Sequence, residues 1–237
     1  MAMLISDRDL WRVLQCPHWP YWEEYGDRTQ RRSLSDEKER VLRGTLAFEA
    51  KIVKEMFPER ITVRSRDAVS AFRRTLALMQ AGAEAIYQPV LRTDLQETRP
   101  TLLERVPGKS HFGDWQYQAV RIKRTHYLRK EDQLIGTFDA LVLERIQGVR
   151  PVRSKQYSGD KELFEIVSEP FVTECQELLV AIERAKAGER PAPAFRKSCL
   201  DTSPWGTLCT ALAESTNDLA LIFNVDRKKV EALRGLG

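Results

Sequence analysis

Two cations lie two residues apart in the segment WQYQAVRIKR, which spans residues 115–124. The composition of this segment is typical of a β-strand, in which every second side chain points to the same face. Arg121 and Lys123 therefore share one face of the predicted strand with Tyr117. Cations at this spacing can contact phosphate groups or pair with carboxylates. The partners of Arg121 and Lys123 thus decide what this strand can do.

A carboxylate lies on the apolar seam of a predicted helix that runs from Ser35 to the residue before Pro58. The seam follows helical spacing and comprises Leu42, Leu46, Glu49, Val53 and Met56. A glutamate in such a seam is costly unless it is paired, binds a metal ion or reaches water at the edge. Glu49 is therefore a candidate site residue. The alternative is a glutamate at the rim of the seam with its carboxylate in solvent.

Four cysteines, at positions 16, 175, 199 and 209, suggest a further chemistry. Cys16 ends a predicted N-terminal helix, and Cys175 belongs to the apolar stripe of a later one. Cys199 follows the stiff, proline-rich segment RPAPAF. Cytosolic cysteines are seldom paired as disulfides, so metal binding and plain burial are the competing interpretations. For Cys175 we favour burial in the core.

The composition indicates a globular protein with one large domain and a small appendage. The 237 residues are 42% apolar and 30% charged. The formal net charge of +4 permits an acidic partner such as nucleic acid. No apolar run approaches the roughly 20 residues of a membrane span, and the N-terminus lacks the pattern of a signal peptide. We therefore expect a cytoplasmic protein without a membrane span.

The elements that must position these residues predict an α/β fold, more narrowly α+β, with a central sheet flanked by helices. Further helices are expected over residues 68–81 and 131–147, and between Pro170 and Gly188. Short β-rich segments separated by turn residues supply the strands: AIYQPVLR, TLLERV, WQYQAVRIK, VRSKQY and LFEIV. The last forty or so residues are predicted to be a separate helical unit.

The order and spacing of these motifs resemble the RecB-like branch of the PD-(D/E)XK nuclease superfamily, especially the small RecB-type nucleases related to the CRISPR adaptation exonucleases. The resemblance covers nearly the whole chain. It implies a restriction-endonuclease-like core with a mixed central sheet in residues 1–195. It also implies a C-terminal extension in residues 196–237, with a cluster-motif segment and part of a helix-hairpin-helix.

Three of the family's site positions keep the residue that the resemblance leads us to expect. Glu49 stands in the helical motif GTLAFE, and Lys123 stands in the strand motif YQAVRIK. Gln133 opens a helix whose end carries the matching sequence at residues 146–148, Ile-Gln-Gly. By resemblance, the lysine would orient or activate water.

Three other site positions depart from the family pattern. Phe48 stands at the histidine position, Thr101 at the metal-binding aspartate position and Arg121 at the second acid position. Phosphodiester hydrolysis in this superfamily is thought to use one or two divalent ions held by those acids. Because a guanidinium repels Mg²⁺ or Mn²⁺, Thr101 and Arg121 should disable metal binding. We therefore expect no divalent catalytic metal.

The cysteine motif of the family is also incomplete. The family typically holds a four-iron cluster with one N-terminal and three C-terminal cysteines. Cys16, Cys199 and Cys209 match this pattern, but Ser203 stands at the remaining position. Loss of the cluster is the favoured interpretation. Asp201 or a non-protein ligand could still complete a residual iron–sulfur site.

The resemblance with these losses implies a catalytically inactive homologue that serves as a nucleic-acid-binding or scaffolding subunit. Its candidate phosphate ligands are Arg121, Lys123, Arg124, Arg227, Lys228 and Lys229. A solvated helix face is the alternative interpretation of the last three. If the partner is instead a protein complex, the aromatic residues Trp19, Tyr21 and Trp22 are candidate anchors.

Two alternatives stay open. An active metal-dependent DNA exonuclease would need migrated acids, for which Glu104, Asp114 and Asp139 are candidates. Strand alternation turns Glu104 away from the face of Thr101, and Asp139 is expected to face solvent. The second alternative is a protein-interaction or assembly factor that does not bind nucleic acid, because a fold does not fix a function.

Overall fold

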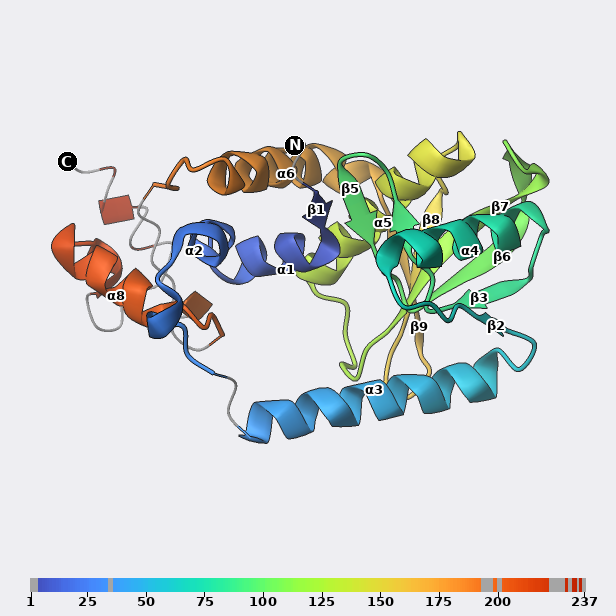
Figure 1. Cartoon of the computed structure of the whole chain (residues 1–237), viewed down its shortest axis with the longest axis horizontal. Coiled ribbons are helices and arrows are strands. Elements are labelled where there is room, and N and C mark those ends of the chain that lie inside the picture. The colour runs from blue at the N-terminus through green and yellow to red at the C-terminus, as the bar shows by residue number, and fades with distance from the viewer. Residues whose placement is uncertain are drawn as a thin grey trace. The chain divides into compact units, whose positions relative to one another are not determined.

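The chain forms two compact units, seen in a computed structural model (Figure 1). Unit 1 comprises Met1–Arg8 and Asp36–Glu177, and unit 2 comprises Asp9–Ser35 and Leu178–Gly237. The structure describes residues 4–33, 36–192, 198–199, 202–221, 229, 232–233 and 235. Unit 2 thus combines segments from both ends of the sequence. The expected boundary between sequence modules at residue 195 stays a prediction.

Unit 1 contains a mixed six-stranded sheet in the order β2-β3-β6-β7-β8-β9. Its strands are β2 (Ile61–Thr62), β3 (Ala85–Tyr87), β6 (Leu102–Ser110), β7 (Gly113–Ile122), β8 (Arg153–Tyr157) and β9 (Leu163–Val167). The β2–β3 and β7–β8 pairs are parallel, and the other pairs are antiparallel. This arrangement confirms the prediction of a mixed sheet. The β-rich sequence segments overlap β3, β6, β7, β8 and β9, whereas β2 was not predicted.

A second, three-stranded sheet in unit 1 was not expected from the sequence. It consists of β1 (Ile5–Ser6), β5 (Gln96–Thr98) and β4 (Leu91–Arg92), in that order. These strands are too short to carry a visible alternation of apolar and polar residues. Helix α5 (Lys130–Gln147) contacts β4 and β5 of this sheet as well as β7, β8 and β9 of the larger one. It is therefore buried on more than one side.

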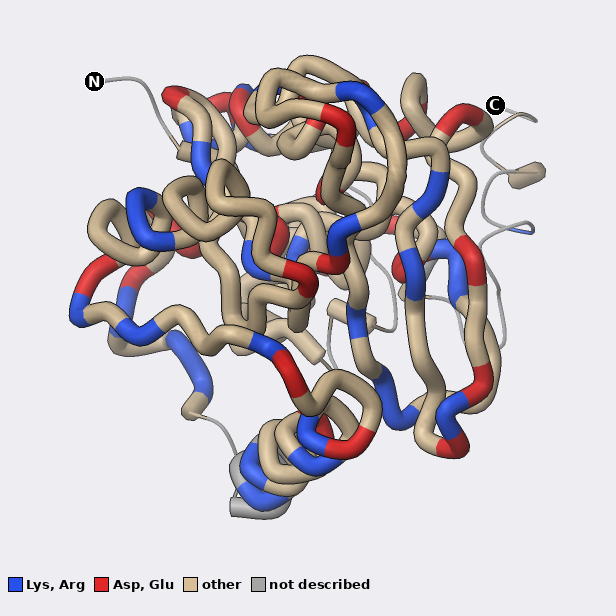
Figure 2. Tube along the Cα trace, turned by 90° about the vertical axis from the view of Figure 1, so that its right-hand side faces the viewer, with Lys and Arg blue, Asp and Glu red and all other residues tan. Residues whose placement is uncertain are grey.

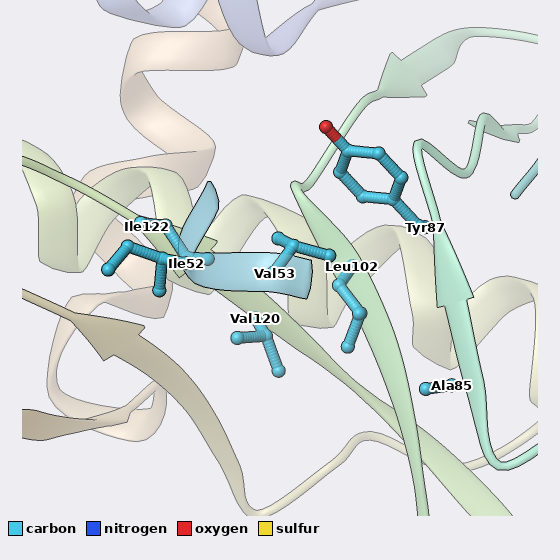
Figure 3. Close-up of a cluster of buried hydrophobic side chains, with 7 residues drawn as sticks. All are labelled: Ile52, Val53, Ala85, Tyr87, Leu102, Val120 and Ile122. Carbon is cyan, nitrogen blue, oxygen red and sulfur yellow. The ribbon is translucent and has the colours of Figure 1, made fainter. Parts of the chain in front are cut away.

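The faces of the six-stranded sheet follow from strand alternation (Figure 3). Leu102 and Val120 pack against Ile52 and Val53 of α3 (Asp36–Met56). Arg121, one position along β7, is bonded to α5 instead. Helices α3 and α5 therefore cover opposite faces of the sheet, which confirms that helices flank it. Helix α4 (Ala68–Gln80) begins at Asp67, whose carboxylate accepts a hydrogen bond from the Ser70 N–H at 2.8 Å.

Gln147, in the last turn of α5, acts as a partner for the backbone of β7. Its Oε1 accepts a hydrogen bond from the Tyr117 N–H at 2.8 Å, and its Nε2 donates to the Tyr117 carbonyl at 3.0 Å. Of the residues of β7, Val120 to Ile122 pair with β8. The buried amide therefore supplies what a neighbouring strand would supply further along. The matching Ile-Gln-Gly sequence thus has a structural role.

Unit 2 is built around buried aromatic and cysteine side chains. Helix α1 (Asp7–Gln15) enters it from unit 1 and is followed by α2 (Trp19–Tyr25). Helix α6 (Val172–Lys186) also continues into unit 2, and α8 (Gly206–Ser215) lies near its C-terminal end. The described residues also include short 3₁₀ turns at Arg28–Gln30, Glu169–Phe171 and Leu219–Leu221. Helix α2 was missed because its sequence is rich in aromatic and turn residues.

Among the described residues, none of the helices combines the length and the apolar character that a membrane-spanning segment requires.

We predict that Gln147→Ala lowers the free energy of unfolding by about 2 to 4 kcal/mol, because it leaves two buried backbone groups of Tyr117 without partners. Urea denaturation followed by circular dichroism measures this change. The control is Gln80→Ala, at an exposed position in the last turn of α4, which should stay within about 0.5 kcal/mol of wild type. Equal stability of Gln147→Ala and Gln80→Ala would show that the amide does not hold β7.

Candidate functional site

A cleft of about 660 Å³ in unit 1 brings together four of the predicted site residues. Glu49 reaches it from α3, Thr101 from the start of β6, and Arg121 and Lys123 from the end of β7. Gln133, the fifth, lies half-buried in the first turn of α5 and is not part of the cleft wall. Residues that are far apart in sequence thus converge because the β6–β7 hairpin ends beside α3.

Arg121 is the most strongly bound cation of this site. Its Nε and Nη2 donate to the two carboxylate oxygens of Asp139 at 2.7 and 2.8 Å, a bidentate pair. Nη2 also donates to Asp7 Oδ2 at 2.8 Å. Thr98 completes the set by donating from its hydroxyl to Asp139 Oδ1 at 2.5 Å. Only 14% of the Arg121 side chain is exposed, so the guanidinium is held between two carboxylates.

Asp139 is fully buried, and the expectation that it faces solvent is wrong. The sequence argument assumed that α5 buries a single stripe. In the structure α5 contacts strands of both sheets, so a side chain opposite the main stripe is also covered. One signal was available: Asp139 is the only charged residue in the run LIGTFDALVL, residues 134–143. An acid in such a run needs a buried cation.

The charged groups around Arg121 shift one another's pKa values. Burial opposes ionisation of Asp7, yet Arg121 and the backbone N–H groups of Arg99 and Arg8 lower its pKa overall. Complete burial raises the pKa of Asp139, and the attraction of Arg121 opposes that rise. Burial alone would lower the pKa of Arg121, but Asp139 and Asp7 raise it. Arg121 is therefore a permanent cation of the site.

Thr101 serves Glu49 as a hydrogen-bond donor. Its hydroxyl donates to Glu49 Oε2 at 3.1 Å and accepts from the Ile122 N–H at 3.3 Å. Burial raises the pKa of Glu49, while Thr101 and the nearby cations oppose the rise. Among the described residues, the hydrogen-bond partner of Glu49 is Thr101, and Arg121 and Lys123 act on it only as nearby charges. Leu46, on the same predicted seam, is 58% exposed, whereas Val53, further along the seam, is fully buried.

Lys123 is the second cation of the cleft. Its Nζ lies 3.6 Å from Asp132 Oδ1, and about a third of its side chain is exposed. Burial, followed by repulsion from Arg121, lowers its pKa. Asp132 has a second role, because its carboxylate accepts the Arg129 N–H at the start of α5. Lys123, in the wall of the cleft, thus interacts with an acid that also caps a helix.

The other candidate phosphate ligands are distributed differently. Arg124 is exposed, and its guanidinium lies 5.8 Å from the ring centroid of Phe48. Phe48, at the family's histidine position, thus contacts a cation by its ring face. Lys229 is exposed, whereas Arg227 and Lys228 lie outside the described residues.

The migrated acids considered from the sequence do not line the cleft. Glu104 accepts hydrogen bonds from Gln118 Nε2 and Lys155 Nζ, both at 2.7 Å, on the face of the sheet opposite to Arg121. Asp114 is exposed near the start of β7, at the far end of the hairpin. Among the described residues, the acids bonded to Arg121 are Asp7 and Asp139. The sequence suggested Asp139 as a migrated catalytic acid, not as a partner of Arg121, and did not suggest Asp7.

The three predicted cluster cysteines meet in unit 2. The Sγ atoms of Cys16, Cys199 and Cys209 all lie within 4.8 Å of one another, and all three residues are buried. The hydrogen bonds that Cys16 shares with Cys199 and Cys209, together with burial, raise its pKa. Ser203 instead accepts the Trp205 N–H at 3.1 Å, and Asp201 lies outside the described residues. Cys175 is buried elsewhere, in α6, as expected.

The aromatic residues near Cys16 are not the exposed anchors that the sequence suggested. Trp19 and Trp22 are buried, and Tyr21 is partly buried, because they pack around the cysteines together with Trp205. Glu23 accepts hydrogen bonds from the indoles of Trp19 and Trp205 at 3.1 and 3.0 Å. This glutamate was not recognised from the sequence, where it lies among turn residues.

No protein-family model matches this chain, and no curated protein is significantly similar to it.

We predict that Arg121→Met lowers the free energy of unfolding by about 3 to 5 kcal/mol at neutral pH, because Asp139 and Asp7 lose their buried cation. Denaturant unfolding of wild type and variant measures the difference. The control Arg153→Met removes an exposed pair with Glu165 and should cost less than about 1 kcal/mol. Unchanged stability of Arg121→Met would contradict the structural role of this ion pair.

The difference in the free energy of unfolding between wild type and Arg121→Met should also depend on pH. Arg121 helps to lower the pKa of Asp7 below its ordinary 3.8, so the stabilisation is present above that pH and is lost as the pH falls through the lowered pKa. The difference in the free energy of unfolding between wild type and Arg121→Met should therefore become smaller in acid.

Proposed function

We propose that this chain is a non-catalytic protein of the RecB-like PD-(D/E)XK nuclease class that binds nucleic acid along its cleft. The sequence motifs and the order of elements support the class. In particular, a helix carries Glu49, a β-hairpin carries Thr101, Arg121 and Lys123, and a helix follows. These residues line one cleft in unit 1, which is what we expect if they occupy the site positions of that class.

One observation supports the proposed loss of catalysis: the ion pair that Arg121 forms with Asp139 and Asp7. A divalent ion needs carboxylate oxygens. Both oxygens of Asp139 accept hydrogen bonds from Arg121, and Asp7 Oδ2 accepts another. The nearest acids are thus committed to a fixed guanidinium, and Thr101 offers Glu49 a hydroxyl rather than a second carboxylate. This site favours a protein cation over a metal ion.

Binding of nucleic acid is supported by the charges around the cleft. Arg66, Arg99 and Lys123 line it, whereas Glu49 and Asp67 are its acids. Arg66 is exposed, and 56% of the Arg99 side chain is exposed although it pairs with Glu97. Helix α3 carries further cations along its length (Figure 2). Four of them are exposed: Arg40, Arg43, Lys51 and Lys54. Because Arg121 is directed to carboxylates, we assign phosphate contacts to Lys123, Arg66 and Arg124.

A protein-interaction function without nucleic acid is the competing proposal. It is favoured by Val41 and Leu46 of α3, each of which is 58% exposed. Exposed apolar side chains on one helix can contribute to an interface with another protein. A protein-interaction function does not predict the steep loss of affinity with salt that phosphate binding shows.

We predict that the protein binds short labelled DNA or RNA with an affinity that falls steeply with salt, because each neutralised phosphate releases counterions. About three such contacts give a slope near −2 to −3 in log K against log salt. Fluorescence anisotropy titrations with single-stranded DNA, duplex DNA and single-stranded RNA measure this slope and identify the preferred nucleic acid.

A charge-reversal pair locates the binding surface. Arg66→Glu, at the cleft, should weaken binding about tenfold or more and make the slope shallower by about one or more. The control Lys109→Glu makes the same charge change at the exposed tip of the β6–β7 hairpin and should have a much smaller effect. Binding that is insensitive to salt, or equal losses in both variants, would argue against the cleft. No binding at low salt would favour the protein-interaction function.

A further inference from the structure

Three thiol groups from separate segments of the sequence converge in unit 2. Cys16 follows the end of α1, Cys199 lies between α6 and α8 in the sequence, and Cys209 lies in the first turns of α8. Their Sγ atoms are all within 4.8 Å of one another, and those of Cys16 and Cys209 are 3.5 Å apart. All three are free cysteines.

The four-iron cluster implied by the family resemblance does not fit these residues. Such a cluster takes four thiolates, and here the remaining family position is Ser203. Its hydroxyl oxygen is engaged by the Trp205 N–H at the entrance to α8. In addition, a cluster of four iron atoms lies between its ligands and requires sulfur atoms that are farther apart than those around a single ion. The sulfur separations found here are short.

A single ion fits the same separations. A tetrahedral zinc site has Zn–S distances of about 2.3 Å, which places neighbouring sulfur atoms about 3.8 Å apart. The Cys16–Cys209 distance of 3.5 Å and the upper limit of 4.8 Å bracket this value. We infer that Cys16, Cys199 and Cys209 bind one thiophilic divalent ion of the Zn²⁺ class, in place of an iron–sulfur cluster. This inference does not depend on the proposed nucleic-acid function.

The surroundings of the thiols suit a closed structural site. Trp19, Trp22 and Trp205 pack against the cysteines in one buried cluster. These rings exclude water, and a structural zinc site is normally closed by its protein ligands. The ion would hold together segments that are 183 and 193 residues apart in sequence, which is a large constraint on the unfolded chain. Metal binding of this kind is coupled to folding.

Among the described residues, His18 is a candidate for a fourth ligand. It is buried two residues after Cys16 and interacts electrostatically with Cys199. Its Nε2 lies 3.2 Å from the Pro191 carbonyl. In the tautomer that donates to this carbonyl, Nδ1 is left with a lone pair for a metal, a common arrangement for histidine ligands. The ring does not belong to the 4.8 Å group itself, so the assignment of the three thiolates stands without it.

The metal content of anaerobically purified full-length protein tests this inference. We expect about one zinc per chain and negligible iron by plasma mass spectrometry. After replacement by Co²⁺, we expect visible d–d bands and a thiolate-to-cobalt charge-transfer band. Iron with acid-labile sulfide would overturn the single-ion site in favour of a cluster. Protein that carries no metal and gives no cobalt bands would identify the thiols as plain core residues and overturn it as well.

Matched variants locate the ligands. Cys16→Ala should lose at least nine tenths of the bound zinc, whereas Cys175→Ala removes an equally buried thiol outside the cluster and should keep it. Because Cys16→Ala could fail to fold, zinc release from wild type during thiol modification provides an independent measurement. Release in step with modification of Cys16, Cys199 and Cys209 is expected. Mass spectrometry that finds a Cys16–Cys209 disulfide in freshly purified protein, or zinc retained in Cys16→Ala, would contradict the site.

Discussion

The guanidinium of Arg121, held between Asp139 and Asp7, is the interaction on which the rest of unit 1 depends. It joins β7 of the six-stranded sheet to α5 and to the first residue of α1, and Thr98 brings in β5 of the smaller sheet. Burying three charges is costly, and the cost is offset only because each charge has close partners of opposite sign. The geometry leaves few alternatives: a neutral or acidic residue at position 121 would leave Asp139 buried without compensation. This constraint also sets the charge of the cleft wall.

The same ion pair connects the fold with the function proposed for the cleft. Glu49, Thr101 and Lys123 line the cleft beside Arg121, and under the proposed function they are what is left of a catalytic site. Its electrostatics are different, because a fixed cation and a hydroxyl stand where the family resemblance leads us to expect metal-binding acids. Such a site can receive a phosphate group without the repulsion of empty carboxylates, and it offers a divalent ion few oxygen ligands. Fold and function are separable here, since the cleft can persist after the chemistry has changed.

The sequence predicted the elements better than their partners. Long periodic segments gave α4 and α5 almost to the residue, and alternation gave β6 and β7, because local patterns determine both. The convergence of Glu49, Thr101, Arg121 and Lys123, and that of the three cysteines, agrees with the motifs. The roles of Asp7, Thr98 and Asp139 were not predicted, since each depends on contacts across 18 to 114 residues that no local pattern encodes. The burial of Trp19 and Trp22 was missed for the same reason: their partners Cys199 and Trp205 come from the other end of the chain.

The measurement that tests the central claim most directly is metal-dependent cleavage of nucleic acid by the purified protein. Wild type and Lys123→Ala are incubated with end-labelled single-stranded DNA, duplex DNA and RNA in Mg²⁺ and in Mn²⁺, with Lys109→Ala as a control outside the cleft. If Arg121 has replaced the metal site, wild type shows no cleavage beyond that of Lys123→Ala. Mn²⁺-dependent cleavage that is present in wild type and Lys109→Ala but lost in Lys123→Ala would establish an active nuclease and contradict this account.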